Sequence, residues 1–311
     1  MTRRDLIGTI AATGAAAFAA KAQAASWKPK LGFLTGYSEP NIEFARQEGF
    51  TCLTVGTNAK FETDEGAEKC KATLRRAGLT VTSLGCMVNH IDPDPAKRRK
   101  ANDEFTGAIG QAARMGIPHL SAMSGSMPGK KLEDQVDEIV RVYHEKYFPL
   151  LQQHNLRIVW EPWPEGPNVA TGPAGYEVLF NAFGDVPYVG LQFDPSHFVR
   201  QFMDPIQCAR DFAPKIWDVH LKDTEIFWPV LKKVGIKPIN GARWWRYRLP
   251  GFGELDWKAF FTVLMDAGYS GGMNIEHEDE LYGNGPGEPI TEEAKTGLHI
   301  THTFLKQYLP V

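Results

Sequence analysis

The sequence predicts a single α/β domain folded as a (β/α)8 TIM barrel. From Leu31 onward, short apolar runs alternate with helical stretches about every 25 to 40 residues, the order expected of repeated strand–helix units. In the second half of the chain, four consecutive runs each end in a carboxylate or an imidazole, the side chains that most often bind metals. These runs are Arg157–Glu161, Val189–Asp194, Ile216–His220 and Gly272–Glu276.

The polar ends of these runs favour a closed barrel over an open sheet. A short apolar run that stops at a charged side chain is typical of a buried parallel strand, whose last residue emerges at the C-terminal end. In a parallel barrel, active sites are built at that rim. An open doubly wound sheet places its ligand at one switch point served mainly by two strands. In addition, no glycine-rich phosphate-binding motif follows any of the strands.

Four strand–helix units are expected in the first half of the chain. Pro40 opens the first helix, and Gly49, Gly78 and Gly116 end the first three, because glycine readily adopts the left-handed conformation that closes a helix. The predicted strands are Leu31–Thr35, Thr51–Val55, Thr80–Val88 and His119–Met123, and the predicted helices are Pro40–Glu48, Glu65–Arg76, Ala96–Met115 and Leu132–His154.

The second half continues the alternation without a linker, a repeat or a low-complexity tract. Its strands are the four runs that end in metal-ligand side chains. Prolines begin two of its helices, in keeping with the preference of proline for the first helical turn. The predicted helices are Pro173–Phe183, Pro205–Phe212, Trp257–Ala267 and Glu292–Tyr308. Residues 25–311 are therefore expected to form one domain.

One connection is much longer than the others. The segment Thr224–Glu254, between the seventh and eighth strands, is rich in aromatic and basic residues. Long loops at the C-terminal rim of a barrel usually carry function, which predicts a lid or a pocket wall here. Aromatic faces and guanidinium groups suit a polyhydroxylated, partly anionic ligand. Alternatively, this segment packs over the end of the barrel and shields it, or it forms a subunit interface. A homo-oligomer is therefore left open.

Residues 1–24 are expected to be an export signal that is removed. Thr2–Ile7 carries the paired arginines of a twin-arginine signal, an alanine-rich apolar stretch follows, and Ala22–Ala24 fits a cleavage site. The alternative, a permanent membrane anchor, needs ~20 strongly apolar residues. We therefore expect a periplasmic or secreted protein without stable membrane association.

The net charge argues against nucleic-acid binding, and the cysteine spacing argues against a zinc site. The 34 Lys+Arg and 37 Asp+Glu residues give a net charge of -3, which offers no general attraction to nucleic acid. The 4 cysteines show no zinc-binding spacing. Buried free thiols are favoured over a disulfide, because Cys52 and Cys86 lie in apolar strand-like runs.

Several motifs in the second half resemble those of a known family. They are Glu161–Pro162, Phe193–His197, Val219–Asp223, Pro250–Trp257 and Ile275–Glu278. Together they are similar to the xylose isomerase-like TIM barrels, in particular the sugar isomerase/epimerase branch with the ketose 3-epimerases. The resemblance implies that Glu161, Asp194, His220 and Glu276 bind one divalent cation, and that the two glutamates also move protons on the two faces of the substrate.

The chemistry of these side chains agrees with the resemblance. Oxygen-dominated ligation favours Mn²⁺ or Mg²⁺, with Co²⁺, Fe²⁺ and Zn²⁺ as substitutes, and folding before export modestly favours Mn²⁺. Such a cation stabilises the enediolate formed when a C–H between two oxygen-bearing carbons is deprotonated. Taken singly, each carboxylate could instead bond backbone N–H groups, and His220 could be a core histidine. Glu278 shares its strand face with Glu276, which is preferred because it directly follows the apolar run.

Five further residues are candidates for substrate binding. By resemblance, His197 contacts a substrate hydroxyl and Arg248 contacts the substrate, with Arg246 as the alternative to Arg248. The others lie beside the proposed ligands or at a strand exit, and each could instead pack or form a salt bridge. They are His90, Trp163 and Lys222.

The sequence thus predicts a metal-dependent isomerase or epimerase for a free sugar, keto-sugar or polyol. The same proton abstraction could expel a substituent, so a periplasmic 3-keto-glycoside lyase or hydratase is the runner-up. An AP endonuclease of the same superfamily needs three zinc ions, further histidines and a basic surface, and is disfavoured. A sugar-binding module without catalysis is the remaining alternative, against which the complete ligand set argues.

Overall fold

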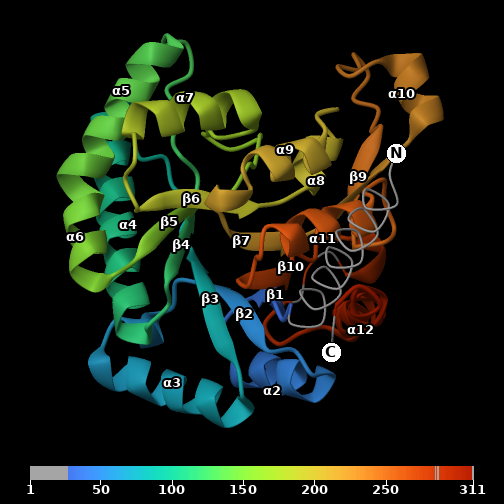
Figure 1. Ribbon diagram of the computed structural model, residues 1–311, viewed down its shortest axis with the longest axis horizontal. Coiled ribbons are helices and arrows are strands. Elements are labelled where there is room, and N and C mark those ends of the chain that lie inside the picture. Colours follow the sequence, from blue (N-terminus) through green and yellow to red (C-terminus); the bar gives the residue numbers. More distant parts are fainter. Residues whose placement is uncertain (1–26, 284, 286, 310–311) are drawn as a thin grey trace, which may run out of the picture.

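Eight parallel strands close into a barrel, and the helices lie around it (Figure 1). The computed structural model describes residues 27–283, 285 and 287–309. The strand order β1-β10-β7-β6-β5-β4-β3-β2 confirms the predicted TIM barrel, whereas the expected export signal lies outside the described residues. The barrel strands are β1 Lys30–Thr35, β2 Cys52–Gly56, β3 Thr80–Gly85, β4 His119–Ala122, β5 Arg157–Trp160, β6 Val189–Phe193, β7 Ile216–Leu221 and β10 Gly272–Ile275.

Most of the predicted helices form close to their expected bounds. Gly49, Gly78 and Gly116 end three of them with φ angles of 82°, 70° and 69°, the left-handed conformation that the sequence predicts. The helices are α2 Glu39–Glu48, α3 Asp64–Ala77, α4 Pro95–Met115, α5 Leu132–Val142, α6 Phe148–His154, α7 Pro173–Phe183, α8 Ser196–Val199, α9 Pro205–Asp211, α10 Trp228–Val234, α11 Trp257–Asp266 and α12 Glu292–Lys306, with short 3₁₀ turns at Ala59–Phe61, Ala213–Lys215 and Glu280–Tyr282.

The predicted helix Leu132–His154 is divided, which the sequence pattern did not reveal. A π-helical turn, Tyr143–Tyr147, separates α5 from α6, and the N–H of Phe148 bonds the carbonyl of Tyr143 five residues earlier. Pro149 follows at once. Proline has no N–H, and its ring crowds the carbonyl four residues before it, so the preceding turn widens.

The long connection after β7 is an ordered excursion. β8 (Asp223–Ile226) pairs antiparallel with β9 (Trp245–Arg248), and α10 lies between them in sequence. Trp244 is buried there against Ile226 and Leu231. Figure 1 shows α10 standing away from the barrel while β9 returns toward it. The structure therefore shows the insertion as a hairpin with its own small core, and a lid movement stays a prediction.

A layer of polar side chains lies buried in the barrel beneath the C-terminal rim. Asp218 Oδ2 accepts hydrogen bonds from Gln192 Nε2 at 2.6 Å and from Ser83 Oγ at 2.9 Å. Ser83 also bonds Thr54 at 2.9 Å, and Ser121 donates to Gln192. Burial raises the pKa of the Asp218 carboxyl. These bonds tie β2, β3, β4, β6 and β7 together directly below the strand ends that carry the candidate ligands.

The state of the cysteines and the length of the helices bear on two of the expectations from the sequence. All four cysteines are buried and free, as favoured. Among the described residues, no helix combines the length and the apolar character needed to cross a membrane.

Lowering the pH should destabilise the fold, because the buried side chain of His90 resists protonation. Burial lowers the pKa of His90 to about 3, whereas an unfolded histidine titrates near 6.5, so the unfolded chain takes up the proton first as pH falls. The stability that His90 contributes is therefore complete above pH ~6.5 and falls by about 2 kcal/mol at pH 5.

Urea unfolding at pH 7.5 and pH 5.0 measures this loss. His90→Asn should reduce the difference between the two pH values by about 2 kcal/mol, whereas substitution of the exposed His154 should leave it unchanged. An equal loss in wild type and His90→Asn would show that other groups govern the acid sensitivity.

Candidate metal centre

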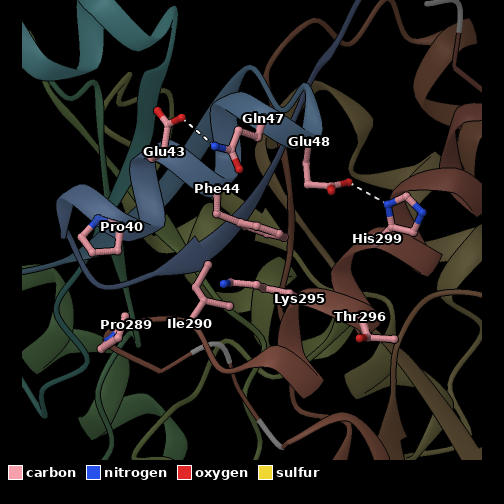
Figure 2. Close-up of a pocket in the computed structure, with 10 residues that line it drawn as sticks. All are labelled: Pro40, Glu43, Phe44, Gln47, Glu48, Pro289, Ile290, Lys295, Thr296 and His299. Atoms are coloured by element: carbon pink, nitrogen blue, oxygen red, sulfur yellow. Dashed lines mark hydrogen bonds and ion pairs between the residues drawn. The ribbon is translucent and has the colours of Figure 1, made fainter.

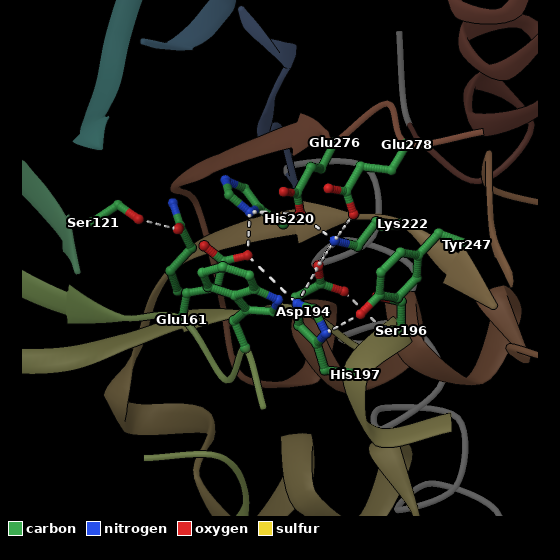
Figure 3. A network of polar contacts seen from close by, with 12 residues as sticks. Ser121, Glu161, Asp194, Ser196, His197, His220, Lys222, Tyr247, Glu276 and Glu278 are labelled. Carbon is green, nitrogen blue, oxygen red and sulfur yellow. Dashed lines mark hydrogen bonds and ion pairs between the residues drawn. The ribbon is translucent and has the colours of Figure 1, made fainter. Parts of the chain in front are cut away.

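The ends of four neighbouring strands bring the predicted ligands to one place at the barrel rim (Figure 3). Glu161 follows β5, Asp194 follows β6, His220 belongs to β7 and Glu276 follows β10. All four side chains are buried, with Asp194 completely enclosed. Because β10, β7, β6 and β5 are consecutive in the barrel, residues far apart in sequence become neighbours here.

The separations are short enough for a shared cation. His220 Nδ1 lies 3.4 Å from Glu161 Oε1 and 3.3 Å from Glu276 Oε2. Ligand atoms of Glu161, Asp194, His197 and Glu276 all lie within 4.8 Å of one another. The structure therefore gathers the four predicted ligands and adds a second imidazole, His197, which the sequence analysis had placed among the substrate contacts. Its sequence signal was its position three residues after Asp194, one turn away on α8.

Unsatisfied polar atoms indicate that the centre is built for a ligand. Asp194 Oδ1 accepts from the backbone N–H of Ser196 at 2.8 Å. Asp194 Oδ2, His197 Nε2 and both ring nitrogens of His220 are buried without a hydrogen-bond partner among the described residues. Buried polar atoms normally find partners, and carboxylate oxygens with imidazole nitrogens are donors that divalent cations accept. The residues present thus fit a divalent metal ion.

The electrostatics of the cluster call for positive charge. Burial by itself would raise the pKa of Glu276, but Lys222 and His220 hold it well below its usual range. Burial would likewise lower the pKa of His220, yet the carboxylates of Glu161 and Glu276 raise it well above its usual range. Burial raises the pKa of Asp194 despite the nearby Lys222. Three buried carboxylates around one ammonium carry an excess of negative charge, which a divalent cation would neutralise.

Lys222 is the cation that the chain itself supplies. Its fully buried Nζ lies 2.7 Å from Glu276 Oε2, 2.8 Å from Glu278 Oε2 and 3.3 Å from Asp194 Oδ2. It also lies 4.2 Å from the centre of the Tyr247 ring. Lys222 therefore forms salt bridges, which were the alternative to a substrate contact in the sequence analysis. Glu278 pairs with Lys222 and is 43% exposed, whereas Glu276 belongs to the cluster of possible metal ligands.

Tyr247 is a site residue that the sequence analysis missed. Its hydroxyl lies 2.8 Å from His197 Nδ1 and accepts a hydrogen bond from Arg200 at 2.8 Å. Tyr247 belongs to β9, so the insertion contributes directly to the centre (Figure 3). The available signal was strand alternation: Tyr247 faces away from its neighbours Arg246 and Arg248.

The other predicted substrate contacts divide into two groups. Trp163 lines the cavity of about 270 Å³ above the centre, together with His197 and Lys222. His90 does not line it, because Phe105, Tyr143 and Tyr147 surround its ring.

The two candidate arginines also lie outside this cavity. Arg248 donates to Asp279 Oδ2 at 2.7 Å and to Glu225 Oε2 at 2.6 Å, and Arg246 also bonds Glu225. The structure therefore places His90 in aromatic packing, the alternative for that residue, and both arginines in salt bridges, which the sequence analysis did not expect.

A larger hollow elsewhere does not carry comparable chemistry. It measures about 600 Å³ and lies between α2 and α12 (Figure 2). Its charged groups are already paired, Glu48 with His299 at 2.9 Å, Glu43 with Arg46 and Lys295 with Glu292. Among the described residues, the cluster of possible metal ligands lies at the barrel rim and not in this hollow.

Comparison with known proteins agrees with the fold. YfiH of Bacillus subtilis, which is uncharacterized, is 27% identical over 86% of this chain and 94% of its own length. Inosose dehydratase of Clostridium tetani is 30% identical over 97 residues, 31% of this chain and 33% of the dehydratase. The structure of D-psicose 3-epimerase from Clostridium cellulolyticum H10, solved with D-tagatose, superposes with a TM-score of 0.66 at 15% identity, covering 91% of this chain and 100% of the epimerase.

The sequence pattern of a whole family also matches the chain. The model of that family, described as the xylose isomerase-like TIM barrel, matches residues 42–301, which include every candidate ligand. This span covers nearly all of the barrel described above. The chain belongs to the xylose isomerase-like TIM barrel family.

Proposed function

We propose that this protein is a divalent-metal-dependent isomerase or epimerase that acts through an enediolate on a keto-sugar, a free sugar or a polyol. The observation that carries the proposal is the buried cluster of Glu161, Asp194 and Glu276 with two imidazoles, in which Asp194 Oδ2, His197 Nε2 and both ring nitrogens of His220 have no hydrogen-bond partner among the described residues. Membership of a sugar-isomerase-like family and the fold shared with D-psicose 3-epimerase support it. We also propose that the protein is periplasmic or secreted, because residues 1–24 resemble an export signal.

Hydrogen-bond direction supports His220, rather than His197, as the imidazole ligand. The Tyr247 oxygen accepts a hydrogen bond from Arg200. Among the described residues, the acceptor within reach of the Tyr247 hydroxyl proton is His197 Nδ1. His197 Nε2 then carries the ring proton and acts as a donor. Glu161, Asp194, His220 and Glu276 would hold the metal, with Mn²⁺ as the first choice among Mn²⁺, Mg²⁺, Co²⁺, Fe²⁺ and Zn²⁺.

Each residue then has a definite task in the reaction. When bound, the cation would stabilise negative charge on two adjacent substrate oxygens. Glu161 and Glu276 come from β5 and β10, on either side of the centre. One of them removes the proton from the carbon beside the carbonyl, and the other returns a proton to the enediolate. His197 Nε2–H donates to a substrate oxygen, and Lys222 holds Glu276 and Glu278 in place through its ion pairs.

A lyase or dehydratase is the second candidate, favoured by the similarity to inosose dehydratase. In that reaction the same carboxylate removes the proton beside the ketone. The C–H electrons form a C=C bond, the C–O bond at the β carbon breaks, and the leaving oxygen takes up a proton to depart as water or an alcohol. A 3-keto-glycoside would lose its aglycone in this way.

Metal analysis and proton exchange test both candidates. The natively purified protein is analysed for bound metal and then incubated in D₂O with ketoses and 3-keto-glucosides. Metal-dependent deuterium incorporation without loss of mass supports an epimerase, and release of water or an alcohol supports the lyase. Binding without exchange by the metal-loaded protein across this panel would contradict an enzyme and favour the sugar-binding module.

Tyr247→Phe should slow turnover without removing the metal. The variant loses the hydroxyl that fixes the His197 ring, so His197 no longer holds its proton toward the substrate. We expect kcat to fall roughly 10- to 100-fold with metal content unchanged. Tyr188→Phe, before β6 at the opposite end of the barrel, is the matched control. Unchanged kcat, or loss of the metal in Tyr247→Phe, would contradict this role.

A further inference from the structure

A second cavity adjoins the one above the metal centre. It measures about 410 Å³ and is formed mainly by the ends of β1 and β2 and by the residues after β10. Leu34, Gly56, Glu276 and Glu278 border both cavities. The second cavity is therefore a direct neighbour of the candidate reaction centre, and not an unrelated surface hollow.

Gly56 leaves a gap between the two cavities. An atom placed at its Cβ position would have nothing within 4 Å. The other three shared residues, Leu34, Glu276 and Glu278, have side chains that extend beyond Cβ. A side chain at position 56 would stand where the cavities meet, so glycine keeps this point open for a ligand that extends from one to the other.

The charges of the second cavity restrict what it can hold. Its lining contains two carboxylates, Glu276 and Glu278, one imidazole, that of His277, and no lysine or arginine. Lys222, which lines the first cavity, is already bound to three carboxylates. A phosphate needs several cationic or N–H donors, whereas this lining sets a single imidazole beside two carboxylates, which repel a phosphate. Small and uncharged groups, those of Thr35, Gly36 and Leu34, suit a neutral hydroxylated group instead.

We propose that the substrate carries an uncharged second unit, as a glycoside or disaccharide does, and that this unit occupies the cavity beside Gly56. The sugar that reacts lies over the metal centre, and its substituent passes Gly56. This inference rests on the proposed function for the reacting end, and it excludes sugar phosphates as the preferred substrates. It holds for an epimerase and for a lyase, because it concerns binding and not the outcome of the reaction.

Three probes with the same reacting end separate the alternatives: D-fructose, isomaltulose (fructose with a glucosyl group on O6) and D-fructose 6-phosphate. Deuterium exchange beside the ketone is measured with the metal-loaded enzyme. We expect kcat/KM for isomaltulose to exceed that for fructose by at least about tenfold, with the phosphate the poorest. Equal or faster exchange of fructose or of its phosphate would overturn the inference.

Substitution at Gly56 locates the second unit. Gly56→Leu should lower kcat/KM for isomaltulose by about tenfold or more beyond any decrease for fructose, because Gly56 also borders the first cavity. Gly56→Ala, which adds only the Cβ, is the control for the loss of glycine. A parallel decrease for both sugars would show that the second unit does not lie there.

Binding keeps this test separate from the test of the reaction. If no probe exchanges deuterium, the proposed reaction fails for these sugars, and saturation-transfer NMR then examines binding alone. Contact of the glucosyl unit of isomaltulose with wild type, weakened in Gly56→Leu, would still support the second subsite. Binding of isomaltulose no tighter than that of fructose would refute it.

Discussion

Replacing Asp194 by asparagine should abolish both metal binding and proton exchange while the fold persists. Asp194 is completely buried, and its Oδ2 has no hydrogen-bond partner among the described residues although it faces Lys222 and His197. Asparagine keeps the shape and the bond from Ser196 but removes the charge. We expect metal affinity to fall by more than about tenfold and turnover by on the order of 10³-fold, because several kcal/mol of charge stabilisation are lost.

A second aspartate provides the matched control. Asp204 also accepts a hydrogen bond from the backbone N–H two residues later, at 2.9 Å, but at the start of α9. Asp204→Asn should leave metal content and turnover unchanged, since asparagine caps a helix nearly as well as aspartate. Elemental analysis, steady-state kinetics and circular dichroism are needed for both variants. Full metal content and activity in Asp194→Asn would refute the metal centre.

Lys222→Met should destabilise the metal-free protein strongly and the metal-bound protein much less. Its ammonium lies among Asp194, Glu276 and Glu278 and is 1% exposed. Removing it deprives the buried Asp194 and Glu276 carboxylates of their ammonium partner, a change that costs about 3–5 kcal/mol. A bound divalent cation supplies positive charge at the same place, so it stabilises the variant more than the wild type.

Urea unfolding with EDTA and with saturating Mn²⁺ measures the two states. The gain from Mn²⁺ should be larger in Lys222→Met than in wild type. Lys69→Met removes an exposed ion pair with Glu65 instead and should change stability by less than about 1 kcal/mol, independently of the metal. If both lysine variants behave alike, Lys222 has no special electrostatic role.

The barrel was predictable because each of its elements carries a local signal. Glycines end α2, α3 and α4, and apolar runs mark the eight strands. Each of these signals can be recognised from a few consecutive residues. The π-turn at Tyr143–Tyr147 and the hairpin of β8 and β9 were not foreseen. The first depends on a proline whose effect is not visible in the hydrophobic period, and the second depends on pairing between segments separated by a helix.

The candidate ligands were predictable from their places at strand ends, whereas their partners were not. Strand ends of a parallel barrel converge whatever the loops do, so Glu161, Asp194, His220 and Glu276 had to approach one another. Which long side chains then enter the cavity depends on rotamers and on neighbouring charges. Lys222 points inward and binds carboxylates, whereas Arg248 points to Glu225 and Asp279.

The amino-acid sequence by itself determined the barrel, its strand order and the four side chains at the rim, because period, caps and strand ends are local properties. Only the tertiary structure decided that Tyr247 bonds His197, that His90 lies in an aromatic cluster, and that a second cavity opens beside Gly56. These features arise between segments distant in sequence, and their energies depend on burial and on charges that no local pattern records.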